Sequence, residues 1–322
     1  MESNNMNRRV FLATAAATGL AGCATAGEGS RCGGASSCCA AKSARCGKKA
    51  RILFGACRQP ADAKLLKAHG YDFFETSAAS AFIPTKSDEE WKRRKEELLA
   101  CGLPLRSCNG FIPGTFRITG PKADFEPALK YAETVLRRAE EIGVKTIVFG
   151  SGGARNVPGD ICGPKDQAPQ PEKGVEQYTE FCKILCGRVS DLKTVQVVIE
   201  PLRPNESNII NYVWQGMQIV REVDHPRLQQ LADIYHMICG KEPAQSIIDA
   251  GCHLKHCHIA CKGTRQFPGT RPDDAEIFKP YFDALKAIGY TGGVSCECGW
   301  PKERPELEKA LDTALALMKS LA

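Results

Sequence analysis

Four acidic or imidazole side chains fall at the ends of four consecutive apolar runs in the second half of the chain. Three runs end in Glu200, Asp233 and Glu297, and the run between the last two carries His258. If these runs are neighbouring strands of a parallel barrel, their carboxyl ends converge on one mouth. Two Glu, one Asp and one His would then form a hard donor set. Such a set suits Mn²⁺, Mg²⁺ or Co²⁺ better than a thiolate-bound structural zinc, although zinc stays possible.

Each of these residues alone has an ordinary structural explanation. A carboxylate after a strand is usually a helix N-cap or a solvated loop residue, and a lone histidine is more often structural. Four in register on successive strands are harder to explain in this way. We therefore predict one divalent-metal site, with Mn²⁺ as the favoured ion and Glu200, Asp233, His258 and Glu297 as its ligands.

From residue 50 onward, short apolar or β-branched runs alternate with longer helical patterns. The predicted strands are 52–57, 71–75, 103–109, 145–150, 195–200, 228–233, 254–259 and 293–297. The predicted helices are 61–69, 88–101, 124–142, 172–190, 208–223, 242–250, 275–288 and 303–321. Gly70, Gly102, Gly143 and Gly289 each follow a helical pattern, as left-handed residues that end helices do.

This alternation predicts an α/β fold with parallel βαβ units, and eight of each make a (β/α)8 TIM barrel spanning residues 50–322 as a single domain. An open doubly wound sheet is the alternative. It is disfavoured because no G-x-G-x-x-G motif opens the first helix.

The first 23 residues have the pattern of an export signal. Arg8 and Arg9 precede an apolar stretch that ends in Leu20-Ala21-Gly22, and Cys23 follows directly. This order is typical of a twin-arginine signal with a lipoprotein box, although a short buried helix behind a chance arginine pair is an alternative. We expect residues 24–49 to form a flexible linker, and the mature protein to face the periplasm, anchored to the membrane only by a lipid on Cys23.

The charge distribution argues against a nucleic-acid partner. The chain has a formal net charge of +6, but residues 1–49 hold seven Lys/Arg against two acids, which leaves 36 basic and 35 acidic residues in the body. A near-neutral body lacks the basic footprint of phosphate-backbone binding. The sequence leaves open whether the protein forms a homo-oligomer.

The chain contains 17 cysteines, and five of them lie in the first 49 residues. No C-x-x-C pair occurs among those five, so a zinc ribbon is weakly supported. Six others fall in or beside predicted strands, where a free thiol packs as a small hydrophobic group. These expected core thiols are Cys57, Cys108, Cys257, Cys261, Cys296 and Cys298.

Several spaced motifs make residues 51–321 resemble the xylose isomerase-like barrel family of sugar and sugar-phosphate isomerases and epimerases, which includes hydroxypyruvate isomerases and ketose 3-epimerases. The motifs are Phe149–Pro158, Ile199–Leu202 with Glu206 and Asn208, Ala232–Met237, His256–Ile259 with Arg265 and Pro268-Gly269, and Gly289-Tyr290 ahead of Glu297.

The resemblance implies a role for each matching residue. Glu200, Asp233, His258 and Glu297 would bind one divalent metal, and Glu200 and Glu297 would also be the catalytic acid/base pair. Glu206, His236 and Arg265 would contact substrate oxygens. For His236 the alternative is a purely supporting contact to Asp233.

The implied enzyme is an isomerase or epimerase acting on a sugar or small hydroxy-ketone by glutamate-mediated proton transfer through an enediolate. An exported enzyme would seldom meet sugar phosphates, so an unphosphorylated substrate is favoured. Two alternatives stay open: a sugar dehydratase or lyase on the same metal site, and a non-catalytic sugar-binding lipoprotein. A DNA-repair endonuclease is disfavoured because the first four predicted strands end without histidine.

Overall fold

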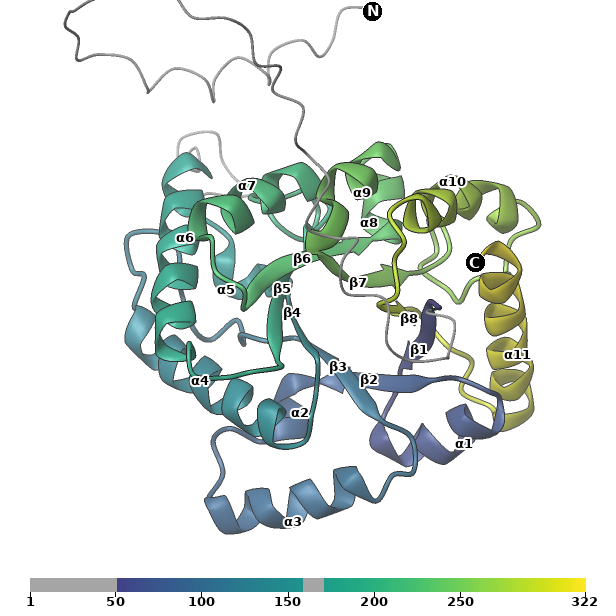
Figure 1. Cartoon of the computed structure of the whole chain (residues 1–322), viewed down its shortest axis with the longest axis horizontal. Coiled ribbons are helices and arrows are strands. Elements are labelled where there is room, and N and C mark those ends of the chain that lie inside the picture. The colour runs from purple at the N-terminus through teal and green to yellow at the C-terminus, as the bar shows by residue number, and fades with distance from the viewer. Residues whose placement is uncertain (1–50, 159–170) are drawn as a thin grey trace, which may run out of the picture. The chain divides into compact units, whose positions relative to one another are not determined.

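The computed structural model describes residues 51–158 and 171–322, so the predicted signal (1–23) and linker (24–49) lie outside the described residues. In the described part, eight parallel strands close into a barrel in chain order, and β8 pairs with β1 (Figure 1). The strands are β1 (Leu53–Cys57), β2 (Phe73–Ser77), β3 (Leu105–Asn109), β4 (Thr146–Phe149), β5 (Gln196–Ile199), β6 (Leu228–Asp233), β7 (Leu254–Ile259) and β8 (Gly293–Cys296). The predicted TIM barrel is confirmed.

Helices surround the barrel (Figure 1). They are α1 (Ala63–Ala68), α2 (Ala78–Phe82), α3 (Asp88–Leu99), α4 (Phe125–Glu141), α5 (Gly152–Arg155), α6 (Pro171–Arg188), α7 (Val213–Val223), α8 (Ile234–Cys239), α9 (Gln245–Ala250), α10 (Asp274–Ala287) and α11 (Arg304–Leu321). The predicted helix over 208–223 is shorter than expected, because residues before Val213 form a loop. In the described part, no helix has both the length and the apolar character that a membrane crossing requires.

Local chemistry explains where several helices begin and end. Helix α3 begins with a capping box, in which the Ser87 hydroxyl accepts a hydrogen bond from the Glu90 amide and the Glu90 carboxylate accepts one from the Ser87 amide. The four glycines predicted to end helices all have positive φ angles, between 63° and 83°. That left-handed backbone is favourable for glycine and releases the chain toward the next strand.

The interior of the barrel has one apolar part and one polar part. Val148, Val198 and Leu231, on β4, β5 and β6, form a small buried cluster apart from the main core between strands and helices. On β2, β3, β7 and β8 the corresponding buried residues are polar: Glu75, Ser107, His256, His258 and Ser295. Because alternate residues of a strand face the same side, each polar side chain is placed inward by its parity along the strand. The polar side chains therefore gather on the side of the interior formed by β2, β3, β7 and β8, and one of them, His258, is also a predicted ligand.

Candidate active site

The structure brings the four predicted metal ligands together. Glu200, Asp233, His258 and Glu297 lie at the carboxyl ends of β5, β6, β7 and β8, and one ligand atom from each lies within 4.8 Å of those of the other three. The first three are buried, whereas the Glu297 side chain is 21% exposed. Glu297 is therefore the member of this cluster that is most accessible from the barrel mouth.

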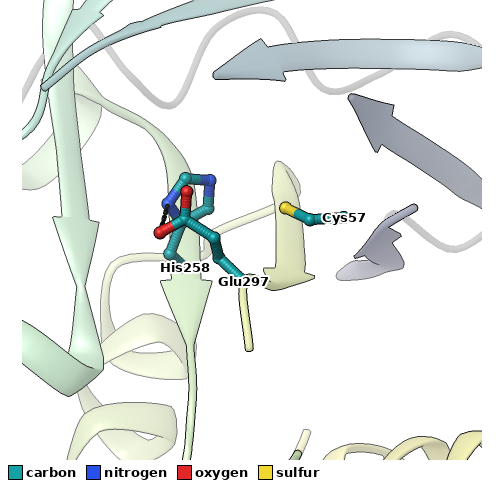
Figure 2. A group of neighbouring side chains, drawn as sticks. All are labelled: Cys57, His258 and Glu297. Atoms are coloured by element: carbon teal, nitrogen blue, oxygen red, sulfur yellow. Dashed lines mark ion pairs between the residues drawn. The ribbon is translucent and has the colours of Figure 1, made fainter. Parts of the chain in front are cut away.

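His258 is the centre of the cluster. Its Nδ1 lies 3.0 Å from Glu200 Oε1 and 3.6 Å from Glu297 Oε2. Figure 2 shows the Glu297 carboxylate lying against the imidazole. Burial opposes protonation of His258, but Glu75, Glu297 and Glu200 together outweigh it and raise the pKa of His258 well above its usual range. The imidazole thus lies in a strongly negative environment.

Asp233 has a second, structural role that fixes its orientation. It is the N-cap of α8, and its Oδ1 accepts hydrogen bonds from the amides of Tyr235 (2.8 Å) and His236 (3.4 Å). The cap occupies one carboxylate oxygen. The expected structural role and the expected ligand role are therefore compatible in one residue.

These residues fit a hard divalent cation. Three carboxylates share one small space, and burial followed by repulsion from Glu200 and Asp233 raises the pKa of Glu297, despite the opposing charges of His258 and Arg265. A bound cation would offset this repulsion. Room for the Glu200 carboxylate depends on Gly150, because a Cβ at that position would lie 2.1 Å from Glu200 Oε2. Oxygen donors with one imidazole are the ligands expected for Mn²⁺ or Mg²⁺.

Two further residues hold Glu297, and one of them was not predicted. Asn109, the last residue of β3, donates a hydrogen bond of 2.7 Å from its Nδ2 to Glu297 Oε1. Arg265 donates from Nη2 to Glu297 Oε2 at 2.6 Å. Both carboxylate oxygens are thereby oriented. Asn109 ends a predicted strand, so its position was visible in the sequence, but nothing there separated it from an ordinary loop amide.

The three predicted substrate contacts, Glu206, His236 and Arg265, also lie at this mouth. Arg265 Nη1 is 3.0 Å from Glu206 Oε1, and His236 Nε2 is 3.8 Å from Glu206 Oε2. His236 is buried, yet neither ring nitrogen makes a hydrogen bond within the described residues. Nε2 lies 3.4 Å from Oδ2 of Asp233, one of the four candidate ligands. A buried imidazole without a hydrogen-bond partner is suited to a substrate hydroxyl.

Tyr235 organises the cationic side of the mouth. The guanidinium groups of Arg203 and Arg265 lie over its ring, 5.2 Å and 5.0 Å from the centroid. Arg203 also donates a 2.6 Å hydrogen bond to the Tyr235 hydroxyl and a 2.7 Å hydrogen bond to Glu206 Oε1. The motif containing Tyr235 was recognised in the sequence, but its aromatic contact with two arginines was not.

Cys57 differs from the expectation of a core thiol. It ends β1, is half-buried, and its Sγ lies within 4.8 Å of ligand atoms of His258 and Glu297 (Figure 2). Burial, with Glu75 and Glu297 nearby, raises the pKa of the thiol well above its usual range. These surroundings therefore favour the uncharged thiol over the thiolate. Cys298 is also half-buried, whereas the other four expected core thiols are buried.

The comparisons with known proteins agree with this architecture. A probable ketose 3-epimerase from Synechocystis sp. is 26% identical over 197 residues, which cover 61% of this chain and 64% of that protein, so the match spans less than two thirds of this relative. A D-psicose 3-epimerase from Ruminiclostridium cellulolyticum is 28% identical over 235 residues, which cover 71% of this chain and 74% of the relative.

Solved structures share the fold. A 3-keto-D-glucoside 4-epimerase from E. coli has a TM-score of 0.66 at 22% identity, covering 84% of this chain and 100% of its own. A D-psicose 3-epimerase, solved in the presence of D-fructose, has a TM-score of 0.69 at 19% identity, with 84% and 99% covered. The sequence profile described as "Xylose isomerase-like TIM barrel" matches residues 63–321. This chain belongs to the xylose isomerase-like TIM barrel family.

Proposed function

We propose that this protein is a divalent-metal-dependent sugar epimerase that inverts the carbon next to the carbonyl of a ketose. The observation that carries the proposal is the convergence of two glutamates on one centre. Glu200 and Glu297 reach His258 from β5 and β8, which lie on either side of β7 in the barrel. The two relatives named as ketose and D-psicose 3-epimerases support this choice of reaction.

The chemistry needs one base and one acid on opposite faces of the sugar. One glutamate removes the proton from the carbon beside the carbonyl, and the C–H electron pair moves toward the carbonyl oxygen. The other glutamic acid then gives a proton to the opposite face, which restores the carbonyl with inverted configuration. Return of the proton to the neighbouring carbon would instead isomerise the sugar.

Other side chains of the mouth would hold the substrate during this transfer. Arg265 is permanently charged and can donate to a substrate oxygen, and His236, beside Glu206, has ring nitrogens that make no hydrogen bond to any described residue. A bound divalent cation would supply positive charge that stabilises the negative charge developing on the substrate oxygens. We propose Mn²⁺ for this position, because three carboxylates and one imidazole form a hard donor set.

The test is incubation of the Mn²⁺-loaded protein with a panel of free ketoses in D₂O. The expected result is deuterium at the carbon next to the carbonyl, together with the epimeric ketose. Exchange accompanied by loss of water would replace epimerisation with dehydration. Saturable sugar binding without any exchange, in the presence of Mn²⁺, would overturn the enzymatic proposal in favour of a sugar-binding protein.

We further propose that the natural substrate is not phosphorylated, which follows from the predicted export signal rather than from the site. Ketoses and their phosphate esters should be compared as substrates under the same conditions. A higher kcat/KM for free ketoses is expected. A strong preference for the phosphate ester would contradict this part of the proposal.

A further inference from the structure

A fully buried carboxylate lies directly behind the proposed metal centre. Glu75, on β2, has no exposed surface, and its Oε1 lies 2.8 Å from Nε2 of His258. Its other oxygen, Oε2, lies 2.8 Å from Nε2 of His256 and accepts a 2.7 Å hydrogen bond from the Ser107 hydroxyl. The Glu75 side chain therefore reaches from β2 to β7 through the polar part of the barrel interior.

This arrangement determines where the protons lie. The Glu75 carboxylate has a hydrogen-bonding neighbour at each oxygen, because Nε2 of His258 and Nε2 of His256 each lie 2.8 Å away and the Ser107 hydroxyl donates to Oε2. An ionised carboxylate only accepts hydrogen bonds, so each histidine must donate from a protonated Nε2. For His258, this leaves Nδ1 as the ring nitrogen that faces Glu200 and Glu297.

We propose that Glu75 is a positioning residue that fixes the ring orientation and the Nε2–H proton of His258, so that Nδ1 is presented to a divalent cation. The inference rests on the metal centre of the proposed function. A histidine ligand whose second nitrogen donates to a carboxylate is held in one tautomer and becomes a stronger base. His256 and Ser107 hold Glu75 in turn, because both donate to the oxygen that His258 leaves free.

The same three residues, Glu75, His256 and His258, are close enough together to be considered as a second metal site. The hydrogen bonds argue against it. Nε2 of both histidines is occupied by the Glu75 carboxylate at 2.8 Å, and a cation there would have to displace both protons in a fully buried space. We therefore expect one bound cation per chain and not two.

The principal test measures Mn²⁺ binding by isothermal titration calorimetry on metal-free wild-type protein and on Glu75→Gln, which keeps the side-chain size and removes the ionised acceptor. The expected change is a Kd about 10- to 100-fold higher in the variant. Ser107→Ala is the matched control, because it removes a hydrogen bond to Oε2 but leaves the contact to His258. It should change the Kd much less.

A purely structural role would lower the Tm of the metal-free protein without changing the Kd of the folded fraction, so both quantities are measured. An equal Kd for wild type and Glu75→Gln, or two Mn²⁺ per wild-type chain, would overturn the inference. Failure of the wild type itself to bind Mn²⁺ would instead reject the metal centre, which keeps the two proposals distinguishable.

A second measurement uses the wild type alone and applies even where Glu75→Gln does not fold. Nitrogen-15 histidine spectra of the Zn²⁺-loaded protein report which ring nitrogen carries a proton. We expect His258 to be protonated at Nε2, with that proton shifted to low field by the Glu75 carboxylate. A spectrum in which Nε2 binds the metal and Nδ1 carries the proton would contradict the proposal.

Discussion

Among the four candidate ligands, Glu297 has the most exposed side chain, and both of its carboxylate oxygens accept hydrogen bonds. Asn109 and Arg265 each hold one of its carboxylate oxygens, and His258 lies 3.6 Å from it. Its side chain is 21% exposed, compared with 7% for Glu200. A catalytic acid or base must reach the substrate while its position is fixed, and Glu297 satisfies both conditions.

Glu297→Gln should therefore abolish turnover while the fold survives. The substitution keeps the size of the side chain but removes its basicity, and its amide NH2 must face either Asn109 or Arg265, which both donate to the carboxylate in the wild type. A general base typically contributes about 10²- to 10⁴-fold in rate, so a loss of at least this size is expected. The measurement is deuterium exchange into the ketose, with circular dichroism to establish folding.

Glu96→Gln is the matched control, since Glu96 lies exposed on α3, away from the mouth, and should behave as the wild type. Unchanged exchange in folded Glu297→Gln would show that Glu297 is not part of the acid/base pair.

At the level of elements, the long periodic segments were predictable and the short ones were not. All eight predicted strands are present, and their predicted ends differ from the observed ends by two residues at most. The agreement is close because most of the strands are apolar runs with glycine or acidic residues at their ends. Helices α2, α5 and α8 have four to six residues, which is too short to display a helical period. They were missed although α5 and α8 lie within recognised motifs.

The same limit explains which site residues were missed. The four candidate ligands stood out because they recur on successive strands, whereas Glu75 and Asn109 each occur singly at the end of a predicted strand. Whether a single polar residue faces the barrel interior depends on strand parity and register. Glu75 pairs with Ser107 just after a register shift between β2 and β3, which no local pattern reveals.

Helix α5 carries a buried arginine that connects the ends of two strands to the following loop. Arg155 donates hydrogen bonds to the carbonyl oxygens of Phe149 (3.3 Å), Glu200 (3.0 Å) and Ile210 (3.2 Å), and to the Ser207 hydroxyl (3.2 Å). It has no exposed surface. Arg155 therefore fixes the backbone from which the Glu200 side chain extends.

Arg155→Met should destabilise the protein by about 1–3 kcal/mol, because the buried Glu200 carbonyl oxygen loses the guanidinium donor, whereas the Phe149 and Ile210 carbonyl oxygens keep a backbone donor each. Urea denaturation measures the free energy of unfolding. Arg93→Met, at an exposed position of α3, is the control and should have little effect. A loss below about 1 kcal/mol for Arg155→Met would mean that other donors or water replace the guanidinium.

At the scale of the whole molecule, the candidate active site and the predicted export signal lie in different parts of the chain. Every candidate site residue lies between Cys57 and Glu297, and the family profile matches residues 63–321. The predicted signal and Cys23, the proposed lipidation position, precede this region and lie outside the described residues. In the part of the chain that the structure describes, the candidate site residues come from strand ends, the loops that follow them and helix α8. We therefore propose that the first 49 residues set where the protein acts and that the barrel sets what it does.

This separation gives a prediction for Cys23→Ser in the full-length protein. Without a thiol at the lipidation position, the protein should move from the membrane fraction to the soluble fraction, because a single signal-derived lipid anchor is the only membrane attachment proposed. Its deuterium exchange activity per mole of protein should equal that of the wild type. Cys32→Ser, at the next cysteine of the chain, is the control and should stay in the membrane fraction with the wild type. Retention of Cys23→Ser in the membrane would reject lipidation at Cys23, whereas its release with reduced activity would show that the N-terminal segment contributes to catalysis as well as to location.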